Sequence, residues 1–196
     1  MKLFNLIPFL ILLVCCSGSE SNSSTTQDEN IPVQEDVFFV PQTIDGVQVQ
    51  REVLLHLPEN FDSTESYPVV IAFHGNGGQN NNWFSKLSQF VDAGEFIGVY
   101  PQGHLNSWNL GAEASSADEV YFFHQIMLKL ETYSFFDASK VYGIGNSNGS
   151  ALINKLAIET SHFSAIAALA SQLIVGTTPN PSTSPVSVYQ MNGTAD

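Results

Sequence analysis

The segment Gly145–Asn146–Ser147–Asn148–Gly149 holds one serine between two glycines. An apolar run over 140–145 predicts a buried strand before it, and the pattern over 148–161 predicts a helix after it. At such a sharp strand-to-helix turn, the glycines let the two backbones pass closely. The serine hydroxyl is then exposed at the end of the strand, and the first N–H groups of the helix favour developing negative charge. The spacing predicts a serine nucleophile, and the alternative is a glycine-rich turn with an incidental serine.

A second glycine-rich segment, 74–78, reads His-Gly-Asn-Gly-Gly and ends the apolar run that begins at Tyr67. In α/β-hydrolases, a loop at this place supplies one N–H group of the oxyanion hole, beside the N–H of the residue after the nucleophile. The predicted donors are therefore the backbone N–H groups of Asn76 and Asn148. His74 is a tempting general base, but we expect it to brace the loop through hydrogen bonds.

The elements that must position these residues alternate along the chain. A helix over 115–133 is expected to begin with a capping box of Ser116 and Glu119. Strands with helices between them predict a mostly parallel sheet in a three-layer α/β fold. The predicted strands cover 47–58, 67–75, 96–103, 140–145, 164–170 and 185–196, and the predicted helices cover 82–95, 115–133 and 148–161.

The first 36 residues carry signals of export. Lys2 precedes an apolar run that ends at Cys15 and Cys16, which predicts a secretory signal over 1–16. This stretch resembles a bacterial lipoprotein signal, in which one cysteine is lipidated, and the alternative is an ordinary cleaved signal. The Ser-, Thr- and acid-rich segment 17–36 predicts a disordered linker. We expect a secreted or lipid-anchored protein whose only membrane contact is this N-terminal anchor.

Composition excludes several classes of function. Six basic residues against nineteen acidic ones give a net charge of −13, which repels phosphate backbones and excludes nucleic-acid binding. Both cysteines of the chain lie in the predicted signal, so the domain expected over 37–196 has no disulfide. No metal-ligand cluster and no cofactor fingerprint is visible in the sequence, and we expect no cofactor.

Five motifs carry a family resemblance. They are PVVIAFHGNGG, GVYPQG…NSWN, ADEVYFF, KVYGIGNSNGS and VSVYQMNGTAD. In this order they resemble the polyhydroxybutyrate depolymerase and feruloyl esterase-like family of secreted α/β-hydrolases, over roughly residues 48–196. The resemblance implies an α/β-hydrolase fold and hydrolysis of carboxylic esters from polymeric or plant-derived substrates. Asn146 and Ser150 depart from the family, which more often has an apolar residue and a glycine there, and Asn192 replaces a frequent histidine.

The resemblance also implies the remainder of a catalytic triad. In this fold the order along the chain is serine, acid and histidine, so Asp196 is the implied acid. The histidine must then follow Asp196. We therefore interpret the sequence as an α/β-hydrolase whose C-terminal part is missing, and expect the fragment alone to be inactive. All five histidines precede the implied acid, at 56, 74, 104, 124 and 162.

The loop over 101–116 follows a central strand, where ligands bind in such sheets. Trp108 in this loop is either a wall of the substrate pocket or a side chain that packs its own loop. The function we predict is a serine esterase that acts through a Ser-Asp-His triad. The alternatives are a peptidase or acyltransferase on the same fold, and a lipid-tethered binding protein with a decayed hydrolase fold.

Overall fold

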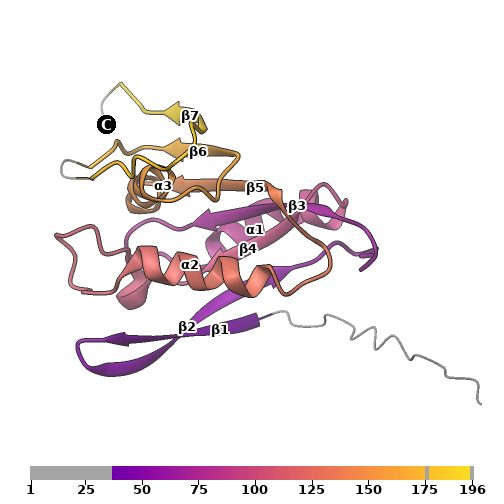
Figure 1. Cartoon of the computed structure of the whole chain (residues 1–196), viewed down its shortest axis with the longest axis horizontal. Helices are drawn as coiled ribbons and strands as arrows, with labels where there is room; N and C mark the ends of the chain where they lie inside the picture. Colours follow the sequence, from indigo (N-terminus) through magenta and orange to yellow (C-terminus); the bar gives the residue numbers. More distant parts are fainter. Residues whose placement is uncertain (1–36, 175–176, 195–196) are drawn as a thin grey trace, which may run out of the picture. The chain divides into compact units, whose positions relative to one another are not determined.

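A computed structural model describes residues 37–174 and 177–194 (Figure 1). The predicted signal over 1–16, the predicted linker over 17–36 and the implied acid Asp196 lie outside the described residues. The described residues belong to one unit of the chain, Pro32–Asp196.

One sheet of seven strands organises the described residues (Figure 1). Its order is β1-β2-β4-β3-β5-β6-β7. The pairs β1–β2 and β2–β4 are antiparallel, and all the other pairs are parallel. The sheet is thus mostly parallel, as predicted. The strands are β1 (Val37–Ile44), β2 (Val47–His56), β3 (Tyr67–Phe73), β4 (Ile97–Pro101), β5 (Phe136–Asn146), β6 (Ala165–Leu169) and β7 (Ser187–Met191).

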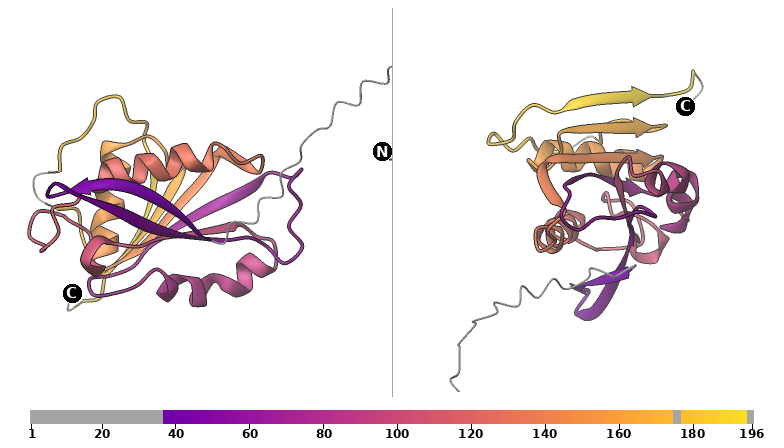
Figure 2. Two further views of the ribbon diagram at one scale, coloured as in Figure 1. Left: turned by 90° about the horizontal axis from the view of Figure 1, so that it is seen from below. Right: turned by 90° about the vertical axis from the view of Figure 1, so that its right-hand side faces the viewer.

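Helices cover both faces of this sheet, which confirms the three layers (Figure 2). Helix α1 (Asn81–Asp92) packs on one face, where Trp83 joins Ala72 and Tyr100 in a small cluster. Helices α2 (Glu119–Leu130) and α3 (Asn148–Glu159) pack on the other face, and a short 3₁₀ helix, η1 (His104–Asn106), follows β4.

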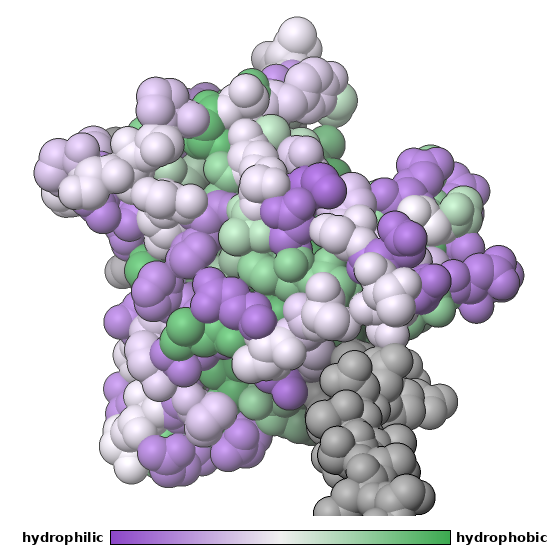
Figure 3. Space-filling model, turned by 45° about the vertical axis from the view of Figure 1, so that its right-hand side comes forward, coloured by the Kyte–Doolittle hydropathy of each residue, from purple (hydrophilic) through white to green (hydrophobic). Residues whose placement is uncertain are grey.

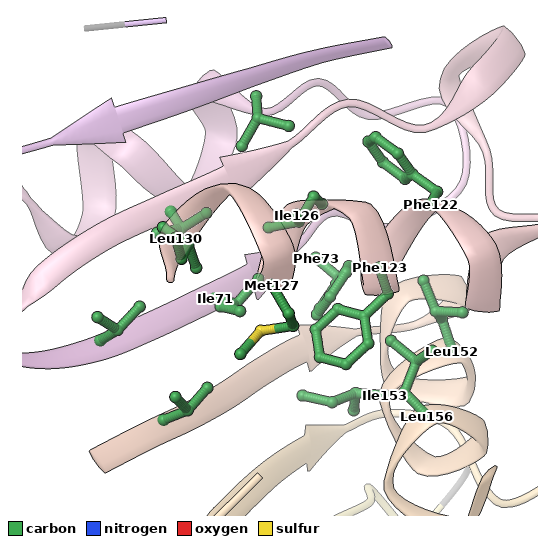
Figure 4. Packing of buried hydrophobic residues seen from close by; sticks show 14 of the residues in the cluster. Ile71, Phe73, Phe122, Phe123, Ile126, Met127, Leu130, Leu152, Ile153 and Leu156 are labelled. Atoms are coloured by element: carbon green, nitrogen blue, oxygen red, sulfur yellow. The ribbon is translucent and has the colours of Figure 1, made fainter. Parts of the chain in front are cut away.

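The larger core lies between the sheet and helices α2 and α3 (Figure 4). Its apolar side chains recur at helical spacing in α2 and at alternate positions in the strands, so that burial follows the two periods of the sequence. Burying them anchors β5 and α3, the two elements that flank Ser147. The labelled members in the figure are Ile71, Phe73, Phe122, Phe123, Ile126, Met127, Leu130, Leu152, Ile153 and Leu156.

Two local expectations differ from the structure. The strand β1 was not predicted, and it forms a hairpin with β2 through Asp45 and Gly46, which both have positive φ. The predicted capping box is wrong: the N-cap of α2 is Asp118, whose side chain accepts the Tyr121 N–H at 2.9 Å. Glu119 turns inward instead, because it pairs with a buried arginine of β2.

Hydrophilic side chains cover much of the face seen in Figure 3, with hydrophobic patches between them. Across the described ranges 37–174 and 177–194, no helix is both long and apolar enough to span a bilayer.

Candidate active site

Ser147 occupies a strained turn between β5 and α3. Its backbone has φ 51° and ψ −124°, a conformation that L-residues rarely adopt and that costs about 1–3 kcal/mol. Its N–H donates to the Leu169 carbonyl of β6 at 2.8 Å, and its own carbonyl accepts from the N–H groups of Ser150 and Ala151. The side chain is exposed. The structure therefore contains the sharp turn that the glycine spacing predicted.

Both glycines of the turn are required by close backbone contacts. A Cβ on Gly145 would lie 2.3 Å from the Gly149 carbonyl oxygen, and a Cβ on Gly149 would lie 2.4 Å from the Phe73 carbonyl oxygen. Real Cβ atoms essentially never come this close to the backbone. The elbow thus packs directly against the end of β3, from which the second glycine-rich loop leaves.

His74 braces that loop, as expected. Its side chain is buried, its Nδ1–H donates to the Gly75 carbonyl at 2.8 Å, and its Nε2 accepts the Gly103 N–H at 3.0 Å. These two bonds assign the proton to Nδ1. Burial lowers the pKa of His74, although the bond to Gly75 opposes this shift. The ring is therefore held neutral as a link between the loops that follow β3 and β4.

The loop after β3 lies against Ser147. A Cβ on Gly75 would lie 3.4 Å from the Cβ of Ser147. Next to it, Asn76 is exposed, and Gly77, with φ +72°, donates its N–H to the Asn106 carbonyl at 2.7 Å. Within the described part of the chain, no residue accepts a hydrogen bond from the Asn76 N–H.

Asn148 offers a second N–H group, because the first residues of a helix have no intrahelical acceptor. The side chain of Asn148 has a role that the sequence did not indicate. Its Oδ1 accepts the Trp108 N–H at 2.8 Å and the Ser107 hydroxyl at 3.3 Å. Its Nδ2 donates to the Trp108 carbonyl at 3.1 Å and to Oε1 of Glu113 at 3.0 Å. All four positions of the amide are therefore used to fasten the loop after β4 onto the elbow.

Trp108 packs inside the protein rather than lining a pocket. Its side chain is 0% exposed, its ring meets Phe73 edge-on at 5.3 Å, and its Nε1–H donates to the His74 carbonyl at 2.7 Å. A side chain without exposed surface cannot touch a ligand here. We therefore correct the pocket-wall interpretation, because the indole holds together its own loop and the loop after β3.

The four other histidines have partners other than Ser147. His56 contacts Asp92 at 2.8 Å, His104 contacts the Ser115 hydroxyl at 2.9 Å, and His124 contacts His162 at 3.0 Å. No described histidine is hydrogen-bonded to Ser147. Nor do the described residues contain a group of three or more His, Cys, Asp or Glu side chains that could hold a metal ion.

Curated proteins with similar sequences are feruloyl esterases. The chain is 29% identical over 115 residues to feruloyl esterase B of Thermothelomyces thermophilus, a match that covers 54% of this chain and 38% of the relative. It is 27% identical over 177 residues to a protein named "Probable feruloyl esterase C" from Aspergillus terreus, over 85% of this chain and 62% of the relative. The chain thus spans less than two thirds of the length of either relative. No protein-family model matches it.

A solved structure shows the same fold. A thermostable esterase superposes with a TM-score of 0.54 at 18% identity, over 72% of this chain and 43% of that chain. At this identity the likeness shows the fold alone. The sheet order, the two helical layers and the elbow are accordingly those of an α/β-hydrolase.

Proposed function

We propose that this feruloyl esterase-like α/β-hydrolase hydrolyses carboxylic esters with Ser147 as its nucleophile. The observation that carries the proposal is the strained, exposed Ser147 at the start of α3, with the loop of Gly75 packed against its Cβ. Strain of this kind persists where the surrounding structure enforces it, and it is concentrated at functional sites. A structural turn alone would not need an exposed serine in a strained conformation at this position.

The proposed reaction is acyl transfer to water. The Ser147 hydroxyl attacks the ester carbonyl, and its proton passes to a histidine, which then protonates the leaving alcohol. We assign the backbone N–H groups of Asn76 and Asn148 as the donors that stabilise the oxyanion, since Asn76 follows Gly75, which lies close to Ser147, and Asn148 begins α3 directly after Ser147. Water then releases the acid from the acyl-enzyme by the same steps.

We assign Asp196 as the acid of the triad, and we place its histidine in residues that follow Asp196. The order serine, acid, histidine of this fold supports both assignments. The support from the structure is that β7 lies parallel to β6 and brings the chain to the carboxyl edge of the sheet, shortly before Asp196.

The finer parts of the proposal concern substrate and location. The relatives are named feruloyl esterases, which favours esters of plant-derived acids. A polyhydroxyalkanoate stays a prediction from the motif order. We also propose that the protein is exported, as a secreted or lipid-anchored protein, because a signal is predicted at 1–16. The predicted linker at 17–36 and the hydrolase domain at 37–196 follow this signal.

The test is ester hydrolysis by a chain extended past Asp196 to the length of its relatives. We expect turnover of methyl ferulate or 4-nitrophenyl acetate, and loss of several orders of magnitude in kcat for Ser147→Ala. The control is Ser161→Ala, at an exposed serine beyond α3, which should retain the rate. An unchanged rate for Ser147→Ala would refute the assignment.

A further inference from the structure

Two histidines face each other outside the candidate active site. His124 belongs to α2, and His162 follows the end of α3. Nδ1 of His124 and Nε2 of His162 are 3.0 Å apart, although the two residues are 38 positions apart in the sequence. A hydrogen bond between two ring nitrogens needs one nitrogen to donate and the other to accept, so at least one of the rings is neutral.

Both rings line a cavity of about 630 Å³. This volume is within the range of small-molecule sites, and it admits an ion together with its water molecules. Two carboxylates also line the cavity, whereas no lysine or arginine does, so the lining favours a cation over an anion. None of the lining residues belongs to the turn 145–149 or to the loop 74–78. They are Asp118, Val120, Tyr121, His124, Glu159, Thr160, Ser161, His162 and Asn180.

The two carboxylates are already engaged with other groups. Glu159 pairs with Lys155 at 3.1 Å, and Asp118 accepts the Tyr121 N–H at 2.9 Å as the N-cap of α2. Their charges contribute to the field in the cavity, while the two imidazoles are its strongest ligands for a transition metal, because imidazole suits these ions.

The two rings differ in how firmly they are held. The ring of His162 meets Phe123 edge-on at 5.5 Å, and Phe123 is 1% exposed, so the core supports this ring. His124 is exposed on α2. An exposed side chain changes its rotamer readily, so His124 can turn its ring relative to His162.

The separation of the two nitrogens suits adjacent ligands on one metal ion. Imidazole nitrogens bind zinc at about 2.0–2.1 Å, a length that we use for the neighbouring first-row ions as well. At this length, two nitrogens 3.0 Å apart subtend an angle of about 90–97° at the ion. This is close to the right angle of the square-planar or tetragonal arrangement that is diagnostic of Cu(II) or Ni(II) with nitrogen and oxygen ligands. A tetrahedral zinc ion would need a separation of about 3.3 Å.

We propose that His124 and His162 form a binding site for copper(II), in which the two rings take adjacent positions and water takes the others. The exposed ring of His124 turns until both lone pairs point at the ion. The ring that donated the hydrogen bond moves its proton to its other nitrogen, so both rings stay neutral. Copper(II) is favoured because it binds most tightly among the divalent first-row ions.

The site has a structural consequence for the fold. Among the residues that the structure describes, no group of three or more His, Cys, Asp or Glu side chains could hold a metal ion, so the ion keeps positions for exchangeable water. It cross-links α2 to the segment between α3 and β6. This inference goes beyond the proposed esterase activity and does not depend on Ser147.

The test is a titration of the full chain with copper(II) chloride. The protein carries no affinity tag, and Cys15→Ser and Cys16→Ser are present throughout, because thiolates compete for copper. In NMR spectra, the paramagnetic ion should first broaden the backbone amide signals of 121–125 and 160–163, and the effect should saturate at one ion per chain. Electron paramagnetic resonance should show two nitrogen ligands in a tetragonal site.

Variants identify the ligands. His124→Gln and His162→Gln should each weaken copper binding by at least about tenfold, since even groups that only orient a metal ligand are worth this much. His124→Gln is the cleaner variant, because His124 is exposed and its replacement leaves the core intact. His104→Gln, in the loop after β4 and outside the cavity, is the control and should leave the affinity unchanged.

Three results would overturn the proposal. The first is broadening that begins at other residues, and the second is a resonance spectrum without two nitrogen ligands. The third is an affinity that survives both His124→Gln and His162→Gln, or that His104→Gln lowers as much as they do.

Discussion

The side chain of Asn148 and the backbone of Trp108 hold each other through two hydrogen bonds. The Trp108 N–H donates to Oδ1 of Asn148 at 2.8 Å, and Nδ2 of Asn148 donates to the Trp108 carbonyl at 3.1 Å. Asn148 directly follows Ser147, while the indole of Trp108 donates to the His74 carbonyl at 2.7 Å. One residue pair therefore fixes the elbow, the loop after β4 and the loop after β3 relative to one another, and the proposed oxyanion hole depends on all three.

The first prediction concerns Trp108→Phe. The change removes the Nε1–H donor and leaves the His74 carbonyl without that bond inside the protein. We expect the free energy of unfolding, measured with urea, to fall by about 1–3 kcal/mol. In an extended, active chain, kcat should fall more than KM rises, because the loop that carries Asn76 loses its support.

A matched control exists on the other face of the sheet. Trp83 of α1 donates its Nε1–H to the Phe73 carbonyl at 2.9 Å, so Trp83→Phe removes the same kind of bond. It should lower stability by a similar amount with less effect on kcat, since Trp83 packs with Ala72 and Tyr100 on the other face of the sheet. Equal effects of the two variants on kcat would contradict the proposed role of Trp108.

The second prediction concerns Gly149→Ala. The new Cβ would lie 2.4 Å from the Phe73 carbonyl oxygen and 2.5 Å from that of His74, and both are backbone atoms that cannot rotate away. We expect the free energy of unfolding to fall by at least about 3 kcal/mol. Gly94→Ala is the control: Gly94 has φ +83° but open space around it, so only the backbone penalty of about 1–2 kcal/mol applies. Similar losses for both variants would show that the contact at Gly149 is relieved by a small shift.

The third prediction concerns the buried ion pair of Arg51 and Glu119. Their atoms Nη1 and Oε2 are 2.7 Å apart, and the side chains are 1% and 0% exposed. Burial lowers the pKa of Arg51 and raises that of Glu119, so desolvation outweighs the attraction between the two charges. Glu119→Gln should lower the free energy of unfolding by about 3–5 kcal/mol, because it leaves a buried cation without its anion.

The double variant Arg51→Met with Glu119→Leu tests this explanation. It removes both charges and should recover most of the stability that Glu119→Gln loses. Urea denaturation of the three proteins decides the question. If the double variant is no more stable than Glu119→Gln, the loss comes from the other bonds of the pair, such as the one from Asn109 N–H to Glu119.

The fourth prediction concerns pH and His74. Burial lowers its pKa below the ordinary value of 6.5, so the native state binds fewer protons than the unfolded state just below pH 6.5. The stability that results is fully present above pH 6.5 and is lost as the pH falls through 6.5 towards the lower native pKa. Urea denaturation from pH 8 to 5 should show this decline, and NMR should show that the His74 ring titrates below 6.5. A ring that titrates above 6.5 would contradict the neutral, buried assignment.

The parts of the site that sequence reasoning found are those encoded locally. The glycines at 145 and 149 and the loop at 74–78 stand next to apolar strands, so the sharp turn at Ser147 and the glycine-rich loop after β3 follow from a few adjacent residues. The parallel sheet follows from the alternation of strands and helices.

The parts that it missed depend on partners far along the chain. Asn148 binds Trp108 across 40 positions, and Glu119 reaches Arg51 across 68. Neighbouring residues alone do not show whether Ser116 or Asp118 caps α2. Asp118 is the cap because the side chain of Glu119 is buried in its pair with Arg51. The strand β1 was not predicted, because it is formed by pairing with β2 across the turn at Asp45 and Gly46.

The central claim is that Ser147 is an activated nucleophile, and a fluorophosphonate probe tests it most directly. The probe is added to the chain extended past Asp196, and the modified residue is located by mass spectrometry of peptides. The account predicts one phosphonate per chain at Ser147, no label in Ser147→Ala, and full labelling in Ser161→Ala. Absence of label at Ser147 in the extended, folded chain would contradict the account, and so would label that persists in Ser147→Ala.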